Sequence, residues 1–363
     1  MLRCTSCGNT YPEKFMLRCK CGAPLNLIRH YSGKFKDFLR TQFLDIRRYL
    51  PLLGGDLQFY PQIVPPLTPV VEKKIHNIIT LFKLEYLMPS GSFKDRGTYI
   101  TIAKLKEDKI KEVVLDSSGN AAISLALYGL SEGMKVHIFI PKHTSKGKKR
   151  ILKILKAIVH EVDGDRMETH IKAEEFKGGV YVSHWYNPYF LEGTKSFAYE
   201  FFEEAGEIDY AIIPTGSGTM LLGAYKGFEE LYKFGEIKTT PRLIAVQAEG
   251  YESLLPMGKR KNRLAEGIAI PYPPRKEEII EAIEKSGGMA ISVSEEETMN
   301  AWKKLISMGF LVESTSATVF AAFEKLISKD YFEKGSRILI PLTGSGFKNL
   351  GEMMEIIMGG KTI

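Results

Sequence analysis

Leu87-Met-Pro-Ser-Gly-Ser-Phe-Lys94-Asp-Arg-Gly97 combines a strand-like run, a Pro/Gly break and a lysine at the start of a predicted helix. The positive end of a helix dipole disfavours a cation in the first turn, so we expect a lowered pKa for Lys94. A deprotonated amine is what imine chemistry requires. Taken alone, the stretch is better interpreted as a solvated lysine at a helix start, so the rest of the chain has to decide.

The composition is typical of an ordinary soluble protein, with 44% hydrophobic and 26% charged residues. The formal net charge of +7 is a small excess of 50 basic over 43 acidic residues. Because this excess is spread along the chain, we expect no nucleic-acid partner. The densest basic run, residues 142–156, has apolar residues at roughly helical spacing and is interpreted as a solvated helix face. No apolar run approaches the roughly 18 residues of a membrane span, and the first residues lack the apolar core of a signal peptide. We therefore expect a cytoplasmic protein with no membrane partner.

All four cysteines, Cys4, Cys7, Cys19 and Cys21, fall in the first 21 residues, and each pair is followed by a glycine. Thiolates spaced in this way can converge on one tetrahedral ion, which predicts a small zinc ribbon. The second pair is Cys-x-Cys rather than Cys-x-x-Cys, which weakens the match. Two disulfides, or a relic ribbon that holds no metal, are the alternatives.

From residue 67 onward, strand and helix patterns alternate, which predicts an α/β protein with largely parallel sheets. Eight segments have the composition of strands: 78–84, 112–115, 136–140, 158–162, 179–183, 210–213, 242–248 and 337–340. Apolar residues recur at helical spacing between most of them, as in 121–128, 194–203 and 220–232. Residues 26–66 are interpreted as a helical arm. Ligands of such proteins bind where strands give way to helices.

Three loops rich in glycine and hydroxyl groups follow predicted strands. Residues 116–120 read Asp-Ser-Ser-Gly-Asn and offer hydroxyls, an amide and helix N-terminal N–H groups to an anion, although helix capping alone would also explain them. Residues 215–219 read Thr-Gly-Ser-Gly-Thr, and their glycines would let the backbone approach a phosphate. Residues 343–346 repeat Thr-Gly-Ser-Gly after a later strand.

Together with Lys94, these loops resemble the threonine synthase branch of the β-family (fold type II) of pyridoxal-phosphate enzymes, in which Ser-Phe-Lys-Asp-Arg-Gly is the most branch-specific motif. The resemblance runs from Cys4 to Asn349 and implies a tryptophan synthase β-like fold, with pyridoxal 5'-phosphate held by Lys94 as a Schiff base. It also implies that the hydroxyl of Thr343 faces the pyridine nitrogen, which favours elimination and replacement over transamination. The resemblance further implies that Ser117, Ser118 and Asn120 bind the substrate carboxylate. It implies that Asn120 also hydrogen-bonds the phenolic oxygen of the cofactor. The cofactor phosphate is implied to bind Gly216, Ser217, Gly218 and Thr219.

The architecture that we expect from this resemblance has three parts. Residues 1–30 form a zinc-ribbon-like segment, and residues 31–92 together with 193–363 form a large cofactor-binding α/β domain. Residues 93–192 form a small α/β domain inserted between them. We expect the protein to be a homodimer, and the ribbon to hold structural zinc without a catalytic role.

Substrate identity is where the sequence departs from the branch. Asn187-Pro-Tyr-Phe-Leu-Glu-Gly-Thr-Lys195 resembles the branch's Asn-Pro-Tyr-Arg-Leu-Glu-Gly-Gln-Lys, so Phe190 replaces a phosphate-binding arginine. His184 stands where the branch has an asparagine, and we expect it to contact substrate. An apolar ring cannot pair with a phosphate dianion as a guanidinium does. Either His184, Lys195 or Arg96 supplies the missing cation, or the substrate carries no distal phosphate.

The resemblance implies a carbon-oxygen lyase that converts O-phospho-L-homoserine and water to L-threonine and phosphate, with Lys94 as Schiff-base donor and general base. The alternative is β-elimination or β-replacement on serine, threonine or phosphoserine, as in dehydratases and in cysteine or cysteate synthases. Phe190 favours this alternative, as does the dehydratase-like loop 215–219. A nucleic-acid-binding protein, suggested by the clustered cysteines and a pI near 8.9, is disfavoured because an enzyme-like α/β chain follows the cysteines.

Overall fold

The computed structural model describes residues 1–54, 57–144, 146–164 and 166–357. The chain divides into two compact units. The first consists of Met1–Leu67, Met88–Ser90 and Lys94–Phe197, and the second of Thr68–Leu87, Gly91–Phe93 and Ala198–Ile363. The expected domain boundaries near residues 30, 92 and 192 stay a prediction.

The first unit begins with a three-stranded antiparallel sheet in the order β2-β1-β3. Its strands are β1 Leu2–Cys4, β2 Thr10–Tyr11 and β3 Leu25–Leu27. The arm that follows has only short helices: the 3₁₀ helices η1 Phe35–Phe38, η2 Ile46–Tyr49 and η3 Leu57–Phe59, and the four-residue α1 Leu50–Leu53. Helix α1 has proline in its first turn and ends at Gly54, whose φ of 81° does not continue a helix.

The rest of the first unit is built on a parallel four-stranded sheet in the order β8-β7-β6-β9. The strands are β6 Glu112–Asp116, β7 Lys135–Pro141, β8 Ile158–Val162 and β9 Val180–Tyr181. Its helices are α2 Lys94–Glu107, α3 Asn120–Ser131, α4 Lys146–Ile154 and α5 Arg166–Glu175, with the first half of α6 Pro188–Ala205. The basic run therefore lies largely on a helix, as predicted.

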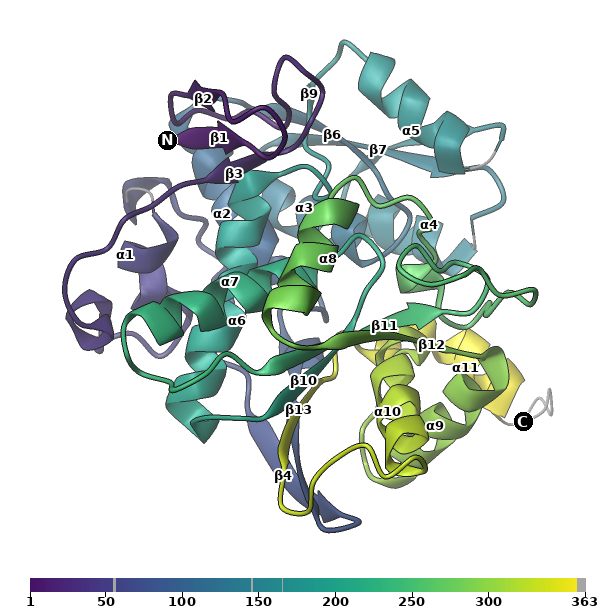
Figure 1. Ribbon diagram of the computed structural model, residues 1–363. Helices are drawn as coiled ribbons and strands as arrows, with labels where there is room; N and C mark the ends of the chain where they lie inside the picture. Colours follow the sequence, from purple (N-terminus) through teal and green to yellow (C-terminus); the bar gives the residue numbers. More distant parts are fainter. Residues whose placement is uncertain (55–56, 145, 165, 358–363) are drawn as a thin grey trace. The chain divides into compact units, whose positions relative to one another are not determined.

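The second unit is built on a six-stranded sheet in the order β12-β11-β10-β13-β5-β4, parallel except for β4. The strands are β4 Val70–Ile75, β5 Ile78–Lys83, β10 Tyr210–Pro214, β11 Arg242–Ala248, β12 Met289–Val293 and β13 Arg337–Pro341. Its helices are α7 Thr219–Lys233, α8 Lys276–Lys285, α9 Glu295–Ser307, α10 Ser314–Ile327 and α11 Leu350–Ile357, with the 3₁₀ turns η4 Glu85–Leu87, η5 Glu266–Ile268 and η6 Gly346–Asn349. Helices α9 and α10 pack side by side, and α10 also contacts the central strands (Figure 1).

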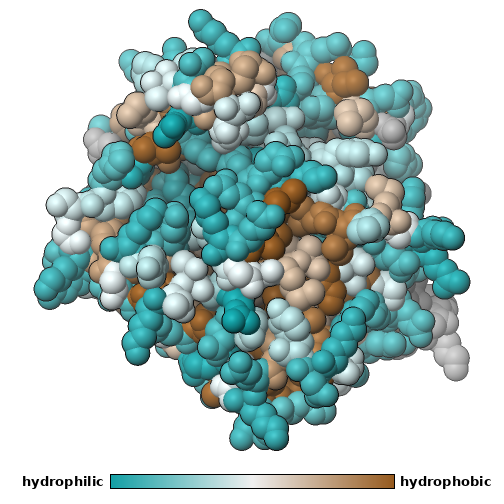
Figure 2. Space-filling view, in the orientation of Figure 1, coloured by the Kyte–Doolittle hydropathy of each residue, from teal (hydrophilic) through white to brown (hydrophobic). Residues whose placement is uncertain are grey.

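The core of the second unit explains this packing. Trp302 on α9 and Phe320 on α10 are buried with Phe82 of β5 and Ile338 of β13 in one apolar cluster. The face shown in Figure 2 is mostly hydrophilic, with apolar atoms gathered where Figure 1 draws α8 and β11. Among the described residues, no helix has both the length and the apolar character needed to cross a membrane.

The predicted α/β class is confirmed: each of the eight predicted strand segments overlaps an observed strand. The prediction of a helical arm over residues 26–66 is only partly right, because prolines and glycines interrupt it into single turns.

Candidate functional site

Lys94 is the first residue of α2 and is half-buried. The buried carboxylate of Asp95, next in the chain, fixes this helix start. It accepts hydrogen bonds from the Ser90 backbone N–H at 2.7 Å and from the Ser124 hydroxyl on α3 at 2.6 Å. The turn before Lys94, the first turn of α2 and the second turn of α3 are thereby held together within the first unit. The lysine is presented by a rigid support, as a reacting amine requires.

Phe190 on α6 lies beside Lys94, and its ring is 3% exposed. The Nζ of Lys94 lies 5.8 Å from the centre of that ring. The ring packs directly on Gly97, where a Cβ atom would come within 2.5 Å of it. Glycine at position 97 is therefore required by the ring at position 190. The residue that replaces the branch's arginine is a buried apolar surface close to the predicted reactive lysine.

His184 extends this aromatic surface, because its ring centre lies 5.5 Å from that of Phe190. The imidazole is buried, and its Nδ1 has no hydrogen-bond partner among the described residues. Burial, assisted by the positive charges of Lys94 and Arg166, holds the pKa of His184 well below its ordinary value. His184 is therefore neutral near pH 7, and it does not supply the cation that Phe190 lacks.

The other two candidate cations are engaged in the interior. Lys195 is fully buried and pairs with Glu192 at 2.7 Å, one turn earlier on α6, and it also donates a hydrogen bond to the hydroxyl of Tyr31. Arg96 is fully buried and donates to the hydroxyl of Ser196 at 3.1 Å. Each of these charges has a structural partner. The contacts of both side chains are those of structural residues, not of ligands for a substrate phosphate.

Residues 117–120 connect β6 to α3, as predicted for an anion-binding loop. Ser117 is buried, whereas Ser118 and Asn120 are half-buried. Gly119 occupies the N-cap position of α3 and provides no side-chain cap. The Ser117 hydroxyl accepts a hydrogen bond from the Gly119 N–H at 3.3 Å. The loop therefore collects hydroxyls at the positive end of a twelve-residue helix, which suits a carboxylate.

In the second unit, residues 215–219 connect β10 to α7. Gly218 is the N-cap of α7 with φ of 80°, and a Cβ atom there would come within 2.2 Å of Ile279. At Gly216 a Cβ atom would lie 2.8 Å from the Cα of Ile268. Ser217 and Thr219 are buried. At Gly216 and Gly218 there is room for the backbone but not for a side chain. Backbone N–H groups at the start of α7, together with the helix dipole, suit a phosphate.

Thr343 follows β13, which is the parallel neighbour of β10 in the same sheet. The two Thr-Gly-Ser-Gly loops therefore lie at the same carboxyl edge of the sheet. The Thr343 hydroxyl is buried and lies 3.1 Å from the hydroxyl of Ser316 in the first turn of α10. Ser316 was not singled out from the sequence. A neutral hydroxyl pair is what the predicted contact with a pyridine nitrogen requires.

The segment before Lys94 is held to this loop within the second unit. The N–H of Phe93 donates to the Thr343 carbonyl at 3.1 Å, and the N–H of Ser345 donates to the Gly91 carbonyl at 2.9 Å. Lys348 also donates to the Gly91 carbonyl at 2.8 Å. Lys94 follows directly in the chain, as the first residue of α2.

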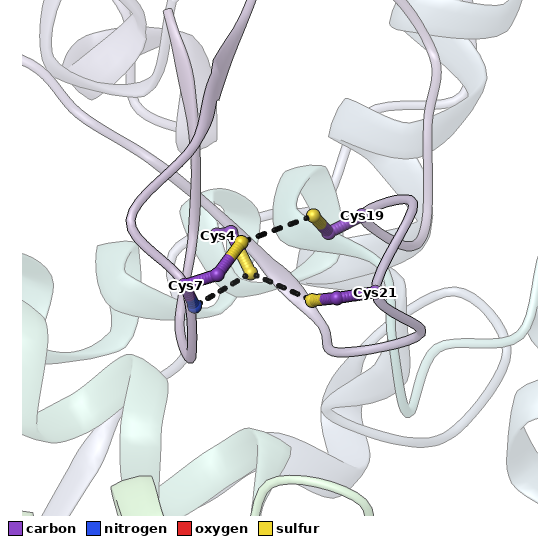
Figure 3. A group of neighbouring side chains, drawn as sticks. All are labelled: Cys4, Cys7, Cys19 and Cys21. Carbon is purple, nitrogen blue, oxygen red and sulfur yellow. Dashed lines mark hydrogen bonds between the residues drawn. The ribbon is translucent and has the colours of Figure 1, made fainter.

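The four cysteines converge at the start of the first unit (Figure 3). Their sulfur atoms all lie within 4.8 Å of one another, and the Cys4–Cys21 and Cys7–Cys19 sulfur pairs are each 3.5 Å apart. A disulfide requires about 2.05 Å, whereas four thiolates around one zinc ion lie roughly 3.8 Å apart. All four cysteines are free. The arrangement fits a tetrahedral zinc site, and the separated sulfur atoms favour it over the two-disulfide alternative.

The environment of Cys19 agrees with metal binding. Its sulfur accepts hydrogen bonds from the Cys21 backbone N–H and from the hydroxyl of Tyr11 at 3.1 Å. These donors lower the pKa of the Cys19 thiol to about 6. A thiolate is the form that binds zinc.

Comparisons with known proteins agree with the predicted chemistry. The family model described as pyridoxal-phosphate dependent enzyme matches residues 65–344. Threonine synthase of Methanocaldococcus jannaschii is 28% identical, and the alignment covers 96% of this chain and 92% of that protein. Threonine synthase of a Bacillus species is 30% identical, with 88% of this chain and 91% of that protein covered.

Solved structures share the fold. The O-acetylserine-dependent cystathionine β-synthase from Helicobacter pylori is 27% identical with a TM-score of 0.66, over 78% of this chain and 94% of that one. A fungal L-serine ammonia-lyase from Rhizomucor miehei is 17% identical with a TM-score of 0.71, over 81% of this chain and 98% of that one.

Proposed function

This chain belongs to the pyridoxal-phosphate dependent enzymes, in their threonine synthase branch, and from that premise we propose that it converts O-phospho-L-homoserine and water to L-threonine and phosphate. The membership confirms the predicted fold type II and the predicted lyase class. The observation that carries the finer proposal is the match to threonine synthases along nearly the whole chain. A small amino acid is the substrate class of this family.

The residues of each unit fit the family's cofactor. Pyridoxal phosphate, when bound, withdraws electrons from the substrate and acidifies its Cα and Cβ protons. We propose that Lys94 binds the aldehyde carbon of the cofactor and, once displaced by substrate, carries protons between Cα and Cβ. The glycine loop at 215–219 would hold the phosphate, and the neutral hydroxyl of Thr343 would accept or donate a hydrogen bond at the ring nitrogen. Asn120 would hydrogen-bond the phenolic oxygen.

The substrate would be oriented by its carboxylate. We propose that the hydroxyls of Ser117 and Ser118, at the positive end of α3, bind this group. His184, which is neutral and whose Nδ1 has no hydrogen-bond partner among the described residues, would accept a hydrogen bond from the substrate. A buried nitrogen of this kind costs free energy unless a ligand satisfies it.

One observation favours the alternative, β-elimination or β-replacement on serine, threonine or phosphoserine. Phe190 is an apolar surface beside Lys94, and the proposed substitutes Lys195 and Arg96 are buried with partners of their own. A phosphate dianion without a cationic partner is strongly disfavoured in such surroundings. An amino acid without a distal phosphate needs no such partner.

The deciding experiment is a visible absorption spectrum of the purified protein during addition of O-phospho-L-homoserine, threonine, serine and phosphoserine in turn. Lys94→Ala is the test variant, and Lys111→Ala, at an exposed position, is the matched control. We expect a cofactor band that is lost only in Lys94→Ala and shifts with O-phospho-L-homoserine, with phosphate released. A band that responds instead to serine, with pyruvate released, would establish the alternative. The absence of any band would contradict both reactions.

The homodimer, the cytoplasmic location and the absence of a nucleic-acid partner remain predictions from the sequence. Zinc binding by the four cysteines is a proposal that rests on their geometry.

A further inference from the structure

Asp116 is the last residue of β6 and directly precedes the loop 117–120. Its carboxylate is buried, with the side chain only 3% exposed. Two side chains distant in sequence contact it: the Tyr181 hydroxyl donates to Oδ1 at 2.5 Å, and the Nδ1 of His170 lies 3.2 Å from Oδ2. The Tyr181 hydroxyl also lies 3.0 Å from the same Nδ1. A buried acid, a histidine and a tyrosine thus form one closed group immediately behind the proposed carboxylate-binding loop.

The proposed mechanism uses none of these three groups, and their arrangement needs an explanation. A buried carboxylate is costly unless it is paired. At this position it also repels any anion bound by the next residues of the chain. Tyr181 supplies a hydrogen bond but no charge. Of the two partners, only His170 can cancel the negative charge of Asp116, and it does so only when protonated.

Charged, polar and aromatic side chains from several elements surround His170. Asp116 and Tyr181 face it from β6 and β9, and the indole of Trp185 stacks on it at 6.4 Å. On its own helix, Glu174 lies 3.7 Å from Nε2 and is itself paired with Arg18 at 2.7 Å. The hydrogen bond to Asp116, opposed by burial and by the charge of Arg18, holds the pKa of His170 above its ordinary value. His170 therefore loses its proton at a pH above the ordinary histidine value of about 6.5.

We infer that His170 acts as a positioning residue for substrate: by neutralising Asp116 behind the loop 117–120, it allows that loop to bind the carboxylate of an amino acid. The inference rests on the proposed function, because it takes residues 117–120 as the carboxylate site. When His170 is protonated, the loop faces a neutral ion pair. When His170 is deprotonated, the loop faces the uncompensated charge of Asp116, and the substrate anion binds less tightly.

The size of the effect follows from the separation of the charges. A carboxylate bound by the next two residues lies roughly 8 Å from Asp116, given the extension of about 3.3 Å per residue. Protonation adds a charge to His170, whose Nδ1 lies 3.2 Å from Asp116 Oδ2, and this charge therefore acts on the bound carboxylate from roughly 8 to 11 Å. Two unit charges at that distance, at an effective dielectric constant of about 20 to 40, change a binding constant by about 4- to 30-fold. We therefore expect KM to rise by about this factor as the pH rises through the pKa of His170, with kcat changing less.

Two substitutions separate this electrostatic role from a structural one, because they act in opposite directions. His170→Gln should give a high KM that no longer varies between about pH 6 and pH 9, a range that brackets a raised histidine pKa. Asp116→Asn should give a low KM that is equally independent of pH. Tyr181→Phe removes a neutral donor and is the matched control, in which the pH dependence of KM should persist. A structural role would raise KM in both charge variants.

A second measurement needs no variant that could misfold. Linkage requires that substrate binding raise the pKa of His170 by the same free energy with which protonation of His170 tightens binding. The imidazole of His170, one of seven histidines, can be titrated by NMR in the holoenzyme with and without bound amino acid. We expect an upward shift of about one pH unit, the counterpart of a tenfold change in affinity. An unchanged pKa, or a wild-type KM that is constant over the same pH range, would overturn the inference.

The probe for both measurements is O-phospho-L-homoserine, with L-serine measured in parallel. Both carry the same α-carboxylate, so the pH dependence must be seen with whichever of them shifts the cofactor spectrum. If the proposed reaction is wrong but the inference is right, the enzyme does not convert O-phospho-L-homoserine, and L-serine binding still depends on pH. Turnover of O-phospho-L-homoserine with a pH-independent KM overturns the inference and leaves the reaction standing.

Discussion

Lys195 offers the sharpest test of how this chain uses its buried charges, because the sequence made it a candidate phosphate ligand and its contacts make it a structural residue. Its Nζ lies 2.7 Å from Glu192, and both side chains are fully buried. Lys195→Met keeps the length of the side chain and removes the charge. We expect the variant to be less stable, with no change in KM.

The magnitude follows from what remains around Glu192. Removing one partner of a buried ion pair costs about 3–5 kcal/mol, because the other charge stays buried without full compensation. Here the Nε of Arg29 lies 3.8 Å from the same carboxylate and would still offset part of its charge. The loss should therefore lie at the lower end, about 3 kcal/mol in the free energy of unfolding. The double variant Lys195→Met with Glu192→Leu removes both charges and should recover most of this loss.

The assay is urea unfolding followed by circular dichroism, together with KM for O-phospho-L-homoserine. Lys233→Met is the matched control, because Lys233 pairs with Glu229 at 2.9 Å while its side chain is 63% exposed. Such a surface pair contributes about 0–1 kcal/mol. If Lys195→Met unfolded at the wild-type urea concentration while KM rose by about tenfold or more, Lys195 would be the distal phosphate ligand, and our reasoning would be refuted.

Three further predictions follow from the same surroundings. Gly97→Ala should destabilise the protein by about 1–3 kcal/mol, because its Cβ would meet the ring of Phe190 at 2.5 Å, and Phe190→Leu should restore part of the loss in urea unfolding. The purified protein should contain about one zinc ion per chain by metal analysis, and Cys19→Ser should lose it while keeping the visible cofactor band. Since burial lowers the pKa of His184, the unfolded state binds its proton first as the pH falls; stability should therefore decline below about pH 6.5, and His184→Leu should reduce that decline.

Among the described residues from 67 onward, the sequence predicted every observed strand except β4 and β12. Strands β8 and β11 were predicted at their observed bounds, since each contains Ile and Val and is followed by an acidic residue and a glycine. Strand β4, which pairs with β5, was missed because it reads Val-Val-Glu-Lys-Lys-Ile and half of its residues are charged. Strand β12, which reads Met-Ala-Ile-Ser-Val, was also missed.

The candidate site divides in the same way. Loops 117–120, 215–219 and 343–346 were predictable because each places glycine and hydroxyl residues directly after an apolar strand. The contacts that decide charge were not predictable, because they join residues far apart in the sequence. His170 lies 54 residues from Asp116, and Tyr31 lies 164 residues from Lys195. By contrast, Lys195 and Glu192 lie three residues apart on one helix, a spacing at which opposite charges are expected to pair.

The replacement of arginine by Phe190 is therefore best understood together with its neighbours rather than as an isolated change. A ring at position 190 requires glycine at position 97, and it lies against a histidine that burial keeps neutral. These features together make the surface beside Lys94 apolar, which suits a substrate whose charges are confined to its α-carbon. If O-phospho-L-homoserine is nevertheless the substrate, its phosphate must meet a cation outside this group. The residue to substitute first is then Arg166. Its guanidinium lies 4.8 Å from the centre of the Trp185 ring, and its positive charge helps to lower the pKa of His184.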